Sequence, residues 1–203
     1  MTRAWLFMLL LTLSACGKSP ALTEHQLYVF GTVVSLSIWD ADPEQEQKAI
    51  AAISTDFQTM HNEWHAWEPG PLLDVNHALA KGEGVRPVHS LIPLIKQSID
   101  FSKQSDGLFN PTIGKLLNLW GFQSSERPDH PPPSDKVIRQ WLDNSPTVDD
   151  LYFENHKLYS KNRNVSLDFG AFAKGYGVDR AIERLRDRKS TRLNSRHTVI
   201  SYA

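Results

Sequence analysis

Residues 167–179, LDFGAFAKGYGVD, constrain the fold more than any other part of the chain. Asp168 ends a predicted strand. A helix is predicted after Gly177, with apolar residues at Val178, Ala181, Ile182 and Leu185. Glycines at such a joint allow close approach to the main chain, and free N–H groups at a helix start can hold a phosphate or ribose. A close-packed joint that carries Lys174 on its surface explains the same residues equally well.

The common nucleotide-binding signatures do not match this segment. The chain contains neither the phosphate loop G-x-x-x-x-G-K-[ST] nor the dinucleotide fingerprint G-x-G-x-x-G. Lys174 can still place a positive charge beside a pyrophosphate. The formal net charge of -1 provides no basic field for nucleic acid, which favours a small-molecule or protein partner.

The first half of the chain predicts a strand followed by a long helix. Residues 27–40, LYVFGTVVSLSIWD, are rich in β-branched and aromatic side chains and alternate in their second half, which predicts a strand. A helix then starts with Asp42 as its capping residue and Pro43 in its first turn. Residues 67–70, WEPG, end this helix. Its predicted buried stripe consists of Ile50, Ile53, Phe57, Met60 and Trp64.

The second half mixes helices and strands. A second helix is predicted from Ser90 and stops before Gly107. Residues 123–135 form a proline-rich connector, and a short helix follows it. Residues 151–169 predict strands separated by a turn at residues 154–157. Because the strands and helices do not alternate regularly, the predicted fold class is α+β.

Two histidines share one face of the long predicted helix. His61, Glu63 and His65 form H-x-E-x-H, which differs from the H-E-x-x-H order of zinc proteases. We interpret these residues as the solvated side of the helix. No G-x-S-x-G sequence supports a serine hydrolase.

The N-terminus has the layout of a secretory signal. Arg3 precedes an apolar run at residues 4–13, which is too short to span a membrane. The single cysteine, Cys16, follows Leu-Ser-Ala, an order that resembles the lipobox of bacterial lipoproteins. We expect residues 1–15 to be a signal peptide, Cys16 to be lipidated and residues 16–26 to tether a domain to the membrane. An ordinary cleaved signal with an incidental cysteine is the alternative.

Four segments, in this order and spacing, resemble the ApbE family of FAD:protein FMN transferases. They are FGTVVSLSIWD from Phe30, WHAWEPGPLLDVN from Trp64, SDGLFNPTIGKLLNLWGF from Ser105 and LDFGAFAKGYGVD from Leu167. The last two carry the specific patterns DG-x-F-[DN]-PT-x-G-x-L-x-NLWGF and LD-x-G-x-x-AKGY. The resemblance covers most of the chain that follows the signal.

The resemblance implies a two-lobed α+β fold with a mixed or antiparallel sheet and flanking helices. It also implies Mg²⁺-dependent transfer of FMN from FAD to a threonine or serine hydroxyl of an acceptor flavoprotein, with release of AMP. The implied acceptors are subunits of membrane redox complexes, and the implied location is the periplasmic side of a bacterial cell membrane. An FAD-binding lipoprotein without transfer activity and an FAD pyrophosphatase are the alternatives.

The resemblance also implies site residues, position by position. The implied cofactor-binding residues are Phe30, Trp67, Leu108, Phe109, Asn110, Asp168 and Lys174. The backbone carbonyl of Ala171 is the implied Mg²⁺ ligand, since this ion takes oxygen ligands. Phe30 and Trp67 stand where the family usually has methionine and tyrosine, and Asn110 stands where aspartate is commoner. No catalytic residue is implied.

The end of the chain shows no regular pattern. Residues 188–203 have neither a helical stripe nor a strand alternation, and they resemble a translated adapter. We therefore expect residues 27–187 to be the N-terminal part of a flavin transferase domain and residues 188–203 to be a non-native tail. The expected domain is then incomplete at its C-terminus and has little or no activity by itself. A native, irregular terminus is the alternative.

Overall fold

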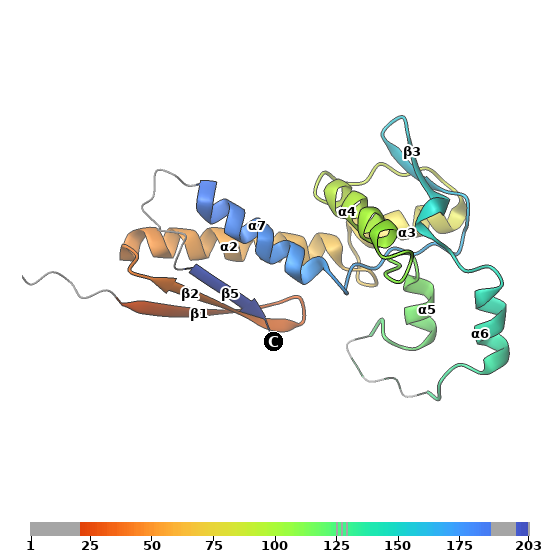
Figure 1. Ribbon diagram of the computed structural model, residues 1–203, viewed down its shortest axis with the longest axis horizontal. Coiled ribbons are helices and arrows are strands. Elements are labelled where there is room, and N and C mark those ends of the chain that lie inside the picture. Colours follow the sequence, from red (N-terminus) through yellow and green to blue (C-terminus); the bar gives the residue numbers. More distant parts are fainter. Residues whose placement is uncertain (1–20, 125, 127, 129, 188–197, 203) are drawn as a thin grey trace, which may run out of the picture.

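The structure is a computed structural model that describes residues 21–124, 126, 128, 130–187 and 198–202. The predicted signal peptide and Cys16 lie outside the described residues. Two lobes follow one another along the longest axis of the molecule (Figure 1). This arrangement of helices with small antiparallel sheets confirms the predicted two-lobed α+β fold.

The two lobes use different parts of the chain. The first lobe contains β1 (Leu22–Val29), β2 (Thr32–Trp39), α2 (Pro43–Trp64), α7 (Ala173–Asp187) and β5 (Thr198–Tyr202). The second lobe contains α3 (Pro71–Lys81), α4 (Leu91–Gln104), α5 (Gly114–Leu119), α6 (Asp135–Leu142), a 3₁₀ turn (Val148–Asp150), β3 (Leu151–Glu154) and β4 (Lys157–Ser160). No helix among the described residues is long and apolar enough to cross a bilayer.

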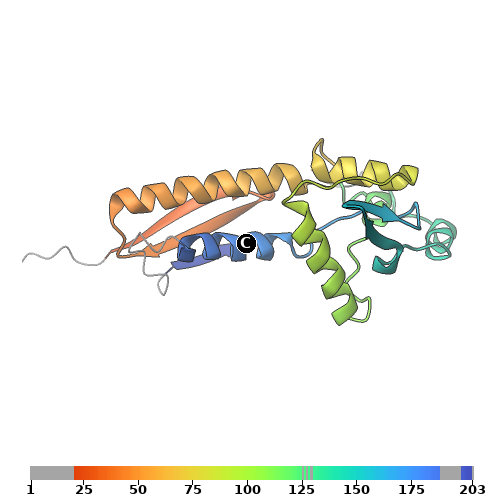
Figure 2. The same ribbon diagram turned by 90° about the horizontal axis from the view of Figure 1, so that it is seen from above.

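The first lobe is a three-stranded antiparallel sheet in the order β1-β2-β5, with α2 and α7 packed on one face (Figure 2). Leu36 of β2, Phe57 of α2 and Leu185 of α7 belong to one buried cluster. Each large apolar side chain that is fully buried contributes about 1.5–3 kcal/mol relative to an exposed one. The helix that carries the glycine-rich segment is thereby held against the N-terminal strands.

The predicted single strand at residues 27–40 is wrong, because a hairpin turn divides it. β1 pairs with β2 antiparallel, from Leu22 opposite Trp39 to Val29 opposite Thr32. The turn residues Phe30 and Gly31 have φ angles of 57° and 68°. Two consecutive positive φ values are typical of a type I′ turn, which usually carries Asn-Gly. β1 also begins within the residues predicted to be a polar tether.

The long helix agrees with its prediction. The Asp42 carboxylate accepts hydrogen bonds from the N–H groups of Glu44 and Gln45, at 3.1 and 3.2 Å, and Pro43 occupies the first turn. Of the predicted stripe, Ile53, Phe57 and Trp64 are buried and Ile50 and Met60 are half-buried. The helix ends at Trp64, and two residues separate it from the WEPG sequence at residues 67–70.

The second lobe has its own core, formed by α3, α4 and the segments around β4. Buried members include Leu72, Leu79, Leu94, Ile95, Leu158, Val165 and Leu167. α4 follows Ser90 and ends at Gln104, as predicted, and β3 and β4 form the predicted strands around residues 154–157. α3 was not predicted.

The last helix starts earlier than its sequence indicated. α7 begins at Ala173, so Gly175 and Gly177 lie within the helix and not before it. A Cβ atom added to Gly177 would lie 3.5 Å from the Phe30 ring and 3.6 Å from the Met60 sulfur. This glycine therefore lies at a close contact between α7, the β1–β2 turn and α2.

The C-terminal residues form a strand that the sequence did not indicate. β5 pairs with β2 antiparallel, with Ser35 opposite Ser201 and Ile38 opposite Thr198. The prediction that the tail contains no strand is therefore wrong for residues 198–202. The expectation that residues 188–203 are a non-native tail stays a prediction.

Candidate functional site

The segment before α7 is held by main-chain hydrogen bonds to the segment before α5. Asp168 N–H donates to the Pro111 carbonyl at 2.9 Å, and Ser166 N–H donates to the Thr112 carbonyl at 3.0 Å. Gly114 N–H in turn donates to the Ser166 carbonyl at 2.8 Å. The two segments with the most specific sequence patterns are therefore paired with each other, and their pairing positions Asp168.

Both carboxylate oxygens of Asp168 accept hydrogen bonds. Oδ1 accepts the Gly170 N–H at 2.9 Å, and Oδ2 accepts a hydrogen bond from Gln123 Nε2 at 3.0 Å. Each carboxylate oxygen has a second lone pair, so the half-buried group can accept further hydrogen bonds. Asp168 is thus an oriented acceptor at the wall of a cleft.

The cleft lies between the β1–β2 turn, the end of α2 and the start of α7. Its volume is about 630 Å³, which is within the usual range for a small-molecule site. It brings together four of the implied cofactor-binding residues, namely Phe30, Trp67, Asp168 and Lys174. These four residues come from three separate segments of the sequence, since Asp168 and Lys174 share residues 167–179, and only the tertiary fold joins them.

Phe30 contributes an aromatic wall to this cleft. Its ring is parallel to Trp64 within 9°, at a centroid distance of 6.2 Å, and its centroid lies 5.6 Å from that of Phe57. Phe30 adopts the left-handed backbone conformation, which costs a residue with a Cβ atom about 1–2 kcal/mol. The ring contacts of Phe30 offset that cost. The turn therefore holds an aromatic side chain at the mouth of the cleft.

Three of the implied cofactor-binding residues do not line this cleft. The Leu108 side chain is 92% exposed. The Phe109 ring packs against Phe172 at a centroid distance of 5.7 Å. Asn110 stabilises its own turn, because its Oδ1 accepts the Thr112 N–H at 3.0 Å while its Nδ2 donates to the Pro146 carbonyl at 2.9 Å. A cofactor role for these residues stays a prediction.

Ala171 lies in the exposed turn between Asp168 and α7. Within the described part of the chain, no group of three or more His, Cys, Asp or Glu side chains could hold a metal ion. Mg²⁺ requires near-octahedral oxygen coordination, and a single carbonyl with ordinary surface groups supplies too little of it. The described residues therefore do not form a complete Mg²⁺ site.

His61 and His65 line the cleft, which corrects their interpretation as a solvated face. The His65 side chain is only 14% exposed, and its ring meets the Trp67 ring edge-to-face at a centroid distance of 4.3 Å. Burial lowers the pKa of His65; His61 lowers it further, while Glu68 and Asp168 act in the opposite direction. The sequence did contain a signal for the burial of His61 and His65, namely their position next to Trp64 at the end of the predicted buried stripe.

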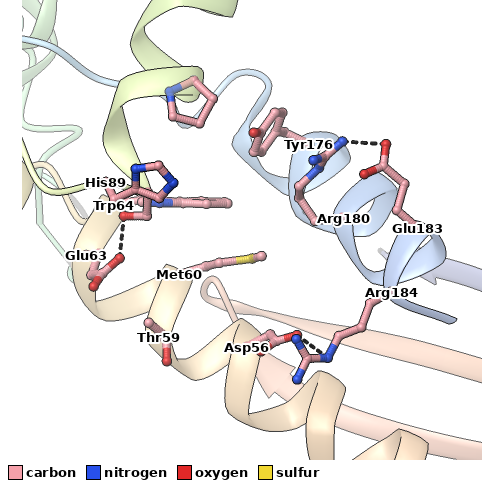
Figure 3. A pocket seen from close by; sticks show the side chains of 12 residues that line it. Asp56, Thr59, Met60, Glu63, Trp64, His89, Tyr176, Arg180, Glu183 and Arg184 are labelled. Atoms are coloured by element: carbon pink, nitrogen blue, oxygen red, sulfur yellow. Dashed lines mark hydrogen bonds and ion pairs between the residues drawn. The ribbon is translucent and has the colours of Figure 1, made fainter. Parts of the chain in front are cut away.

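A second cavity of about 870 Å³ lies between α2, α4 and α7 (Figure 3). Its charged groups are largely paired with one another. Arg184 Nε lies 2.9 Å from Asp56 Oδ2, Arg180 pairs with Glu183, and the Ser90 hydroxyl donates to Glu63. This cavity shares Trp64 with the cleft but contains none of the implied site residues. The cleft is therefore the stronger candidate.

Two relatives named FAD:protein FMN transferase align with most of the chain. The Rhodobacter capsulatus protein is 36% identical over 168 residues, which cover 81% of this chain and 31% of the relative. The Haemophilus influenzae protein is 25% identical over 182 residues, which cover 86% of this chain and 52% of the relative. The chain thus spans between about a third and about half of the length of these relatives.

Solved structures show the same fold. The ApbE protein of Thermotoga maritima aligns with a TM-score of 0.71 at 26% identity, covering 80% of this chain and 52% of that chain. The flavin transferase ApbE of Vibrio cholerae aligns with a TM-score of 0.71 at 20% identity, covering 83% and 54%. Because its sequence identity is so low, the similarity to the Vibrio cholerae protein supports the fold alone.

The sequence pattern of the ApbE family matches residues 30–193. This range contains all four segments that carry the resemblance, and it ends inside the predicted tail at residues 188–203. Since the match covers most of the 203 residues, the chain belongs to the ApbE family.

Proposed function

We propose that the protein to which this chain belongs transfers FMN from FAD to a threonine or serine hydroxyl of an acceptor flavoprotein. Family membership and the names of the relatives support this reaction. The observation that carries it is the cleft in which Phe30, Trp67, Asp168 and Lys174 converge. Because the chain spans only part of its relatives, the proposal concerns the whole protein.

The cleft has the chemical groups that a flavin dinucleotide requires. Phe30 and Trp67 offer aromatic faces on which a planar ring can stack. Asp168 can accept a hydrogen bond from a ribityl or ribose hydroxyl with a lone pair that its present partners leave available. The ammonium group of Lys174 can approach the negative pyrophosphate. FAD is thus the ligand that we assign to the cleft.

The proposed reaction exchanges one phosphorus–oxygen bond for another. The acceptor hydroxyl oxygen attacks the phosphorus atom of the FMN half, and the bond from that phosphorus to the bridging oxygen breaks. A phosphoester forms, AMP leaves with the bridging oxygen, and the hydroxyl proton passes to a base or to water. Lys174, which lines the cleft, would stabilise negative charge on the phosphate oxygens during this step.

Magnesium dependence belongs to the proposal for the whole protein. Bound Mg²⁺ would neutralise charge on the pyrophosphate oxygens. The described residues do not complete a site for it, so no step is assigned to the ion through this chain's own residues.

We also propose that the protein is lipid-anchored through Cys16 on the periplasmic side of a bacterial membrane. The order Leu-Ser-Ala-Cys after an apolar run supports this location. Such an anchor would place the cleft near acceptor subunits of membrane redox complexes. Cys16 and the apolar run lie outside the described residues.

Covalent labelling tests the transfer reaction. The purified protein is incubated with FAD, Mg²⁺ and the flavin-accepting subunit of a bacterial membrane redox complex, and the products are separated on a denaturing gel. A flavin-fluorescent acceptor band together with released AMP is the expected result. Tight FAD binding without a label would instead indicate a carrier, and free FMN with AMP would indicate a pyrophosphatase.

A further inference from the structure

His65 connects the end of α2 to the aromatic wall of the cleft. Its Nδ1 atom lies 3.1 Å from the Glu68 backbone nitrogen, which donates a hydrogen bond to it. Its Nε2 atom lies 3.5 Å from the Glu68 Oε1 atom. Between these two residues the chain turns, and the Trp67 ring packs against the His65 ring at a centroid distance of 4.3 Å. The imidazole thus closes a short loop that carries Trp67.

This contact requires one protonation state of His65. The Glu68 backbone nitrogen can only donate, so Nδ1 must be the unprotonated acceptor and the proton must lie on Nε2. A second proton on Nδ1 would place two donors against each other and break the hydrogen bond. Protonation of His65 therefore releases the turn on which Trp67 stands.

The groups around His65 keep it neutral near pH 7. Burial lowers the pKa of His65 and is the largest influence, and His61 acts in the same direction. Glu68 and Asp168 raise the pKa but do not reverse the direction. Lys174 from α7 and Tyr28 from β1 face the same cavity. Protonation of His65 therefore requires a lower pH than protonation of an ordinary histidine does.

We propose that His65 is a positioning residue that holds Trp67 in its FAD-binding orientation through the unprotonated Nδ1 atom, so that acidification weakens FAD binding. The inference rests on the proposed function only where it assigns FAD to the cleft. Its structural part concerns the orientation of Trp67 and can be measured without any ligand.

The first test measures FAD affinity of the full chain by calorimetry between about pH 7.5 and about pH 5. The His65→Asn variant places an amide oxygen where Nδ1 was, so it accepts the Glu68 N–H but cannot titrate. We expect it to bind FAD slightly more weakly than the original chain near pH 7.5, because the ring contact with Trp67 is lost, and to retain that affinity at acidic pH. His65→Ala should bind about fivefold to tenfold more weakly than the original chain near pH 7.5, because one hydrogen bond and one ring contact are lost, and it should not weaken further on acidification.

His77→Asn is the matched control, because His77 is exposed on α3 and does not line the cleft. This variant should lose affinity on acidification just as the original chain does. Equal affinity of the original chain at both pH values, or tighter binding at acidic pH, would overturn the proposal. Tighter binding that is absent in His65→Asn would show that His65 serves as a cation for the pyrophosphate.

The second test needs no FAD. The indole N–H resonance of Trp67, assigned by its loss in Trp67→Phe, should shift on acidification in the original chain and in His77→Asn. It should stay constant in His65→Asn. A shift of equal size in His65→Asn would overturn the positioning role, even if FAD binds. If this resonance behaves as expected but FAD does not bind, the proposed function fails and the positioning role stands.

Discussion

Asn76 and Leu167 are joined by two hydrogen bonds. Asn76 Nδ2 donates to the Leu167 carbonyl at 2.9 Å, and the Leu167 N–H donates to Asn76 Oδ1 at 2.7 Å. The buried side-chain amide of Asn76, on α3, thus pairs with both main-chain groups of Leu167, as a neighbouring strand would. Leu167 directly precedes Asp168. In this way the second lobe holds the segment that forms one wall of the cleft.

Replacement of Asn76 by alanine should destabilise the protein strongly. Two buried main-chain groups of Leu167 would lose their partners, at about 1–3 kcal/mol each. Urea denaturation should therefore show a loss of about 2–6 kcal/mol in the free energy of unfolding. Asn118→Ala, an exposed position on α5, is the control and should change little. An unchanged midpoint in Asn76→Ala would contradict the role of this pair.

Two glycines of the specific sequence patterns should respond oppositely to alanine. A Cβ atom at Gly114 would lie 2.8 Å from the Ser166 carbonyl oxygen and would push apart the pairing that positions Asp168. We expect Gly114→Ala to cost about 1–3 kcal/mol. A Cβ atom at Gly177 would make ordinary contacts at 3.5 Å with Phe30, so Gly177→Ala should stabilise α7 by up to about 1 kcal/mol. Thermal melts of both variants compare these effects, and similar melting shifts would contradict this packing.

Stability should depend on the protonation of His65. Its pKa is lowered in the folded protein, so between the folded and the ordinary value the unfolded chain binds more protons. The free energy of unfolding is therefore highest above the ordinary histidine pKa and falls as the pH drops toward the folded value. His65→Asn should remove this part of the pH dependence in urea titrations. An identical pH dependence in that variant would assign the effect to other groups.

Substitution of the polar residues of the cleft should weaken FAD binding. Asp168→Asn removes a charged acceptor, and Lys174→Gln removes the cation that we propose to interact with the pyrophosphate. A hydrogen bond to a charged group contributes about 1.5–3 kcal/mol, which corresponds to at least about tenfold in the dissociation constant. Asp100→Asn and Lys103→Gln on the exposed face of α4 are the matched controls for calorimetry. Normal affinity in both cleft variants would refute the assignment of FAD to this cleft.

The membrane anchor can be tested apart from the cleft. Cys16→Ser should move the protein from the membrane fraction to the soluble fraction, because the thiol that we propose as the lipid attachment site would be absent. Mass spectrometry of the membrane-extracted original chain should find acyl chains on Cys16. An unmodified Cys16 in that material would contradict the lipoprotein prediction.

Local patterns determined much of the first lobe. The capping of α2 by Asp42 and the burial of Phe57 and Trp64 follow from neighbouring residues and helical spacing, which do not depend on distant parts of the chain. The hairpin turn at Phe30 was missed because Phe-Gly is an unusual type I′ turn. Contacts with α2 stabilise that turn, and those contacts exist only in the folded protein.

The family resemblance came from four linear segments, and it correctly indicated the fold and the family. The cleft itself was decided by tertiary structure. Asp168 owes its place to main-chain hydrogen bonds with Pro111, and His65 faces the cleft because α2 ends beside the start of α7. Hydrogen bonds and packing between residues far apart in sequence leave no local pattern, so the sequence determined which groups are present and the fold determined which of them meet.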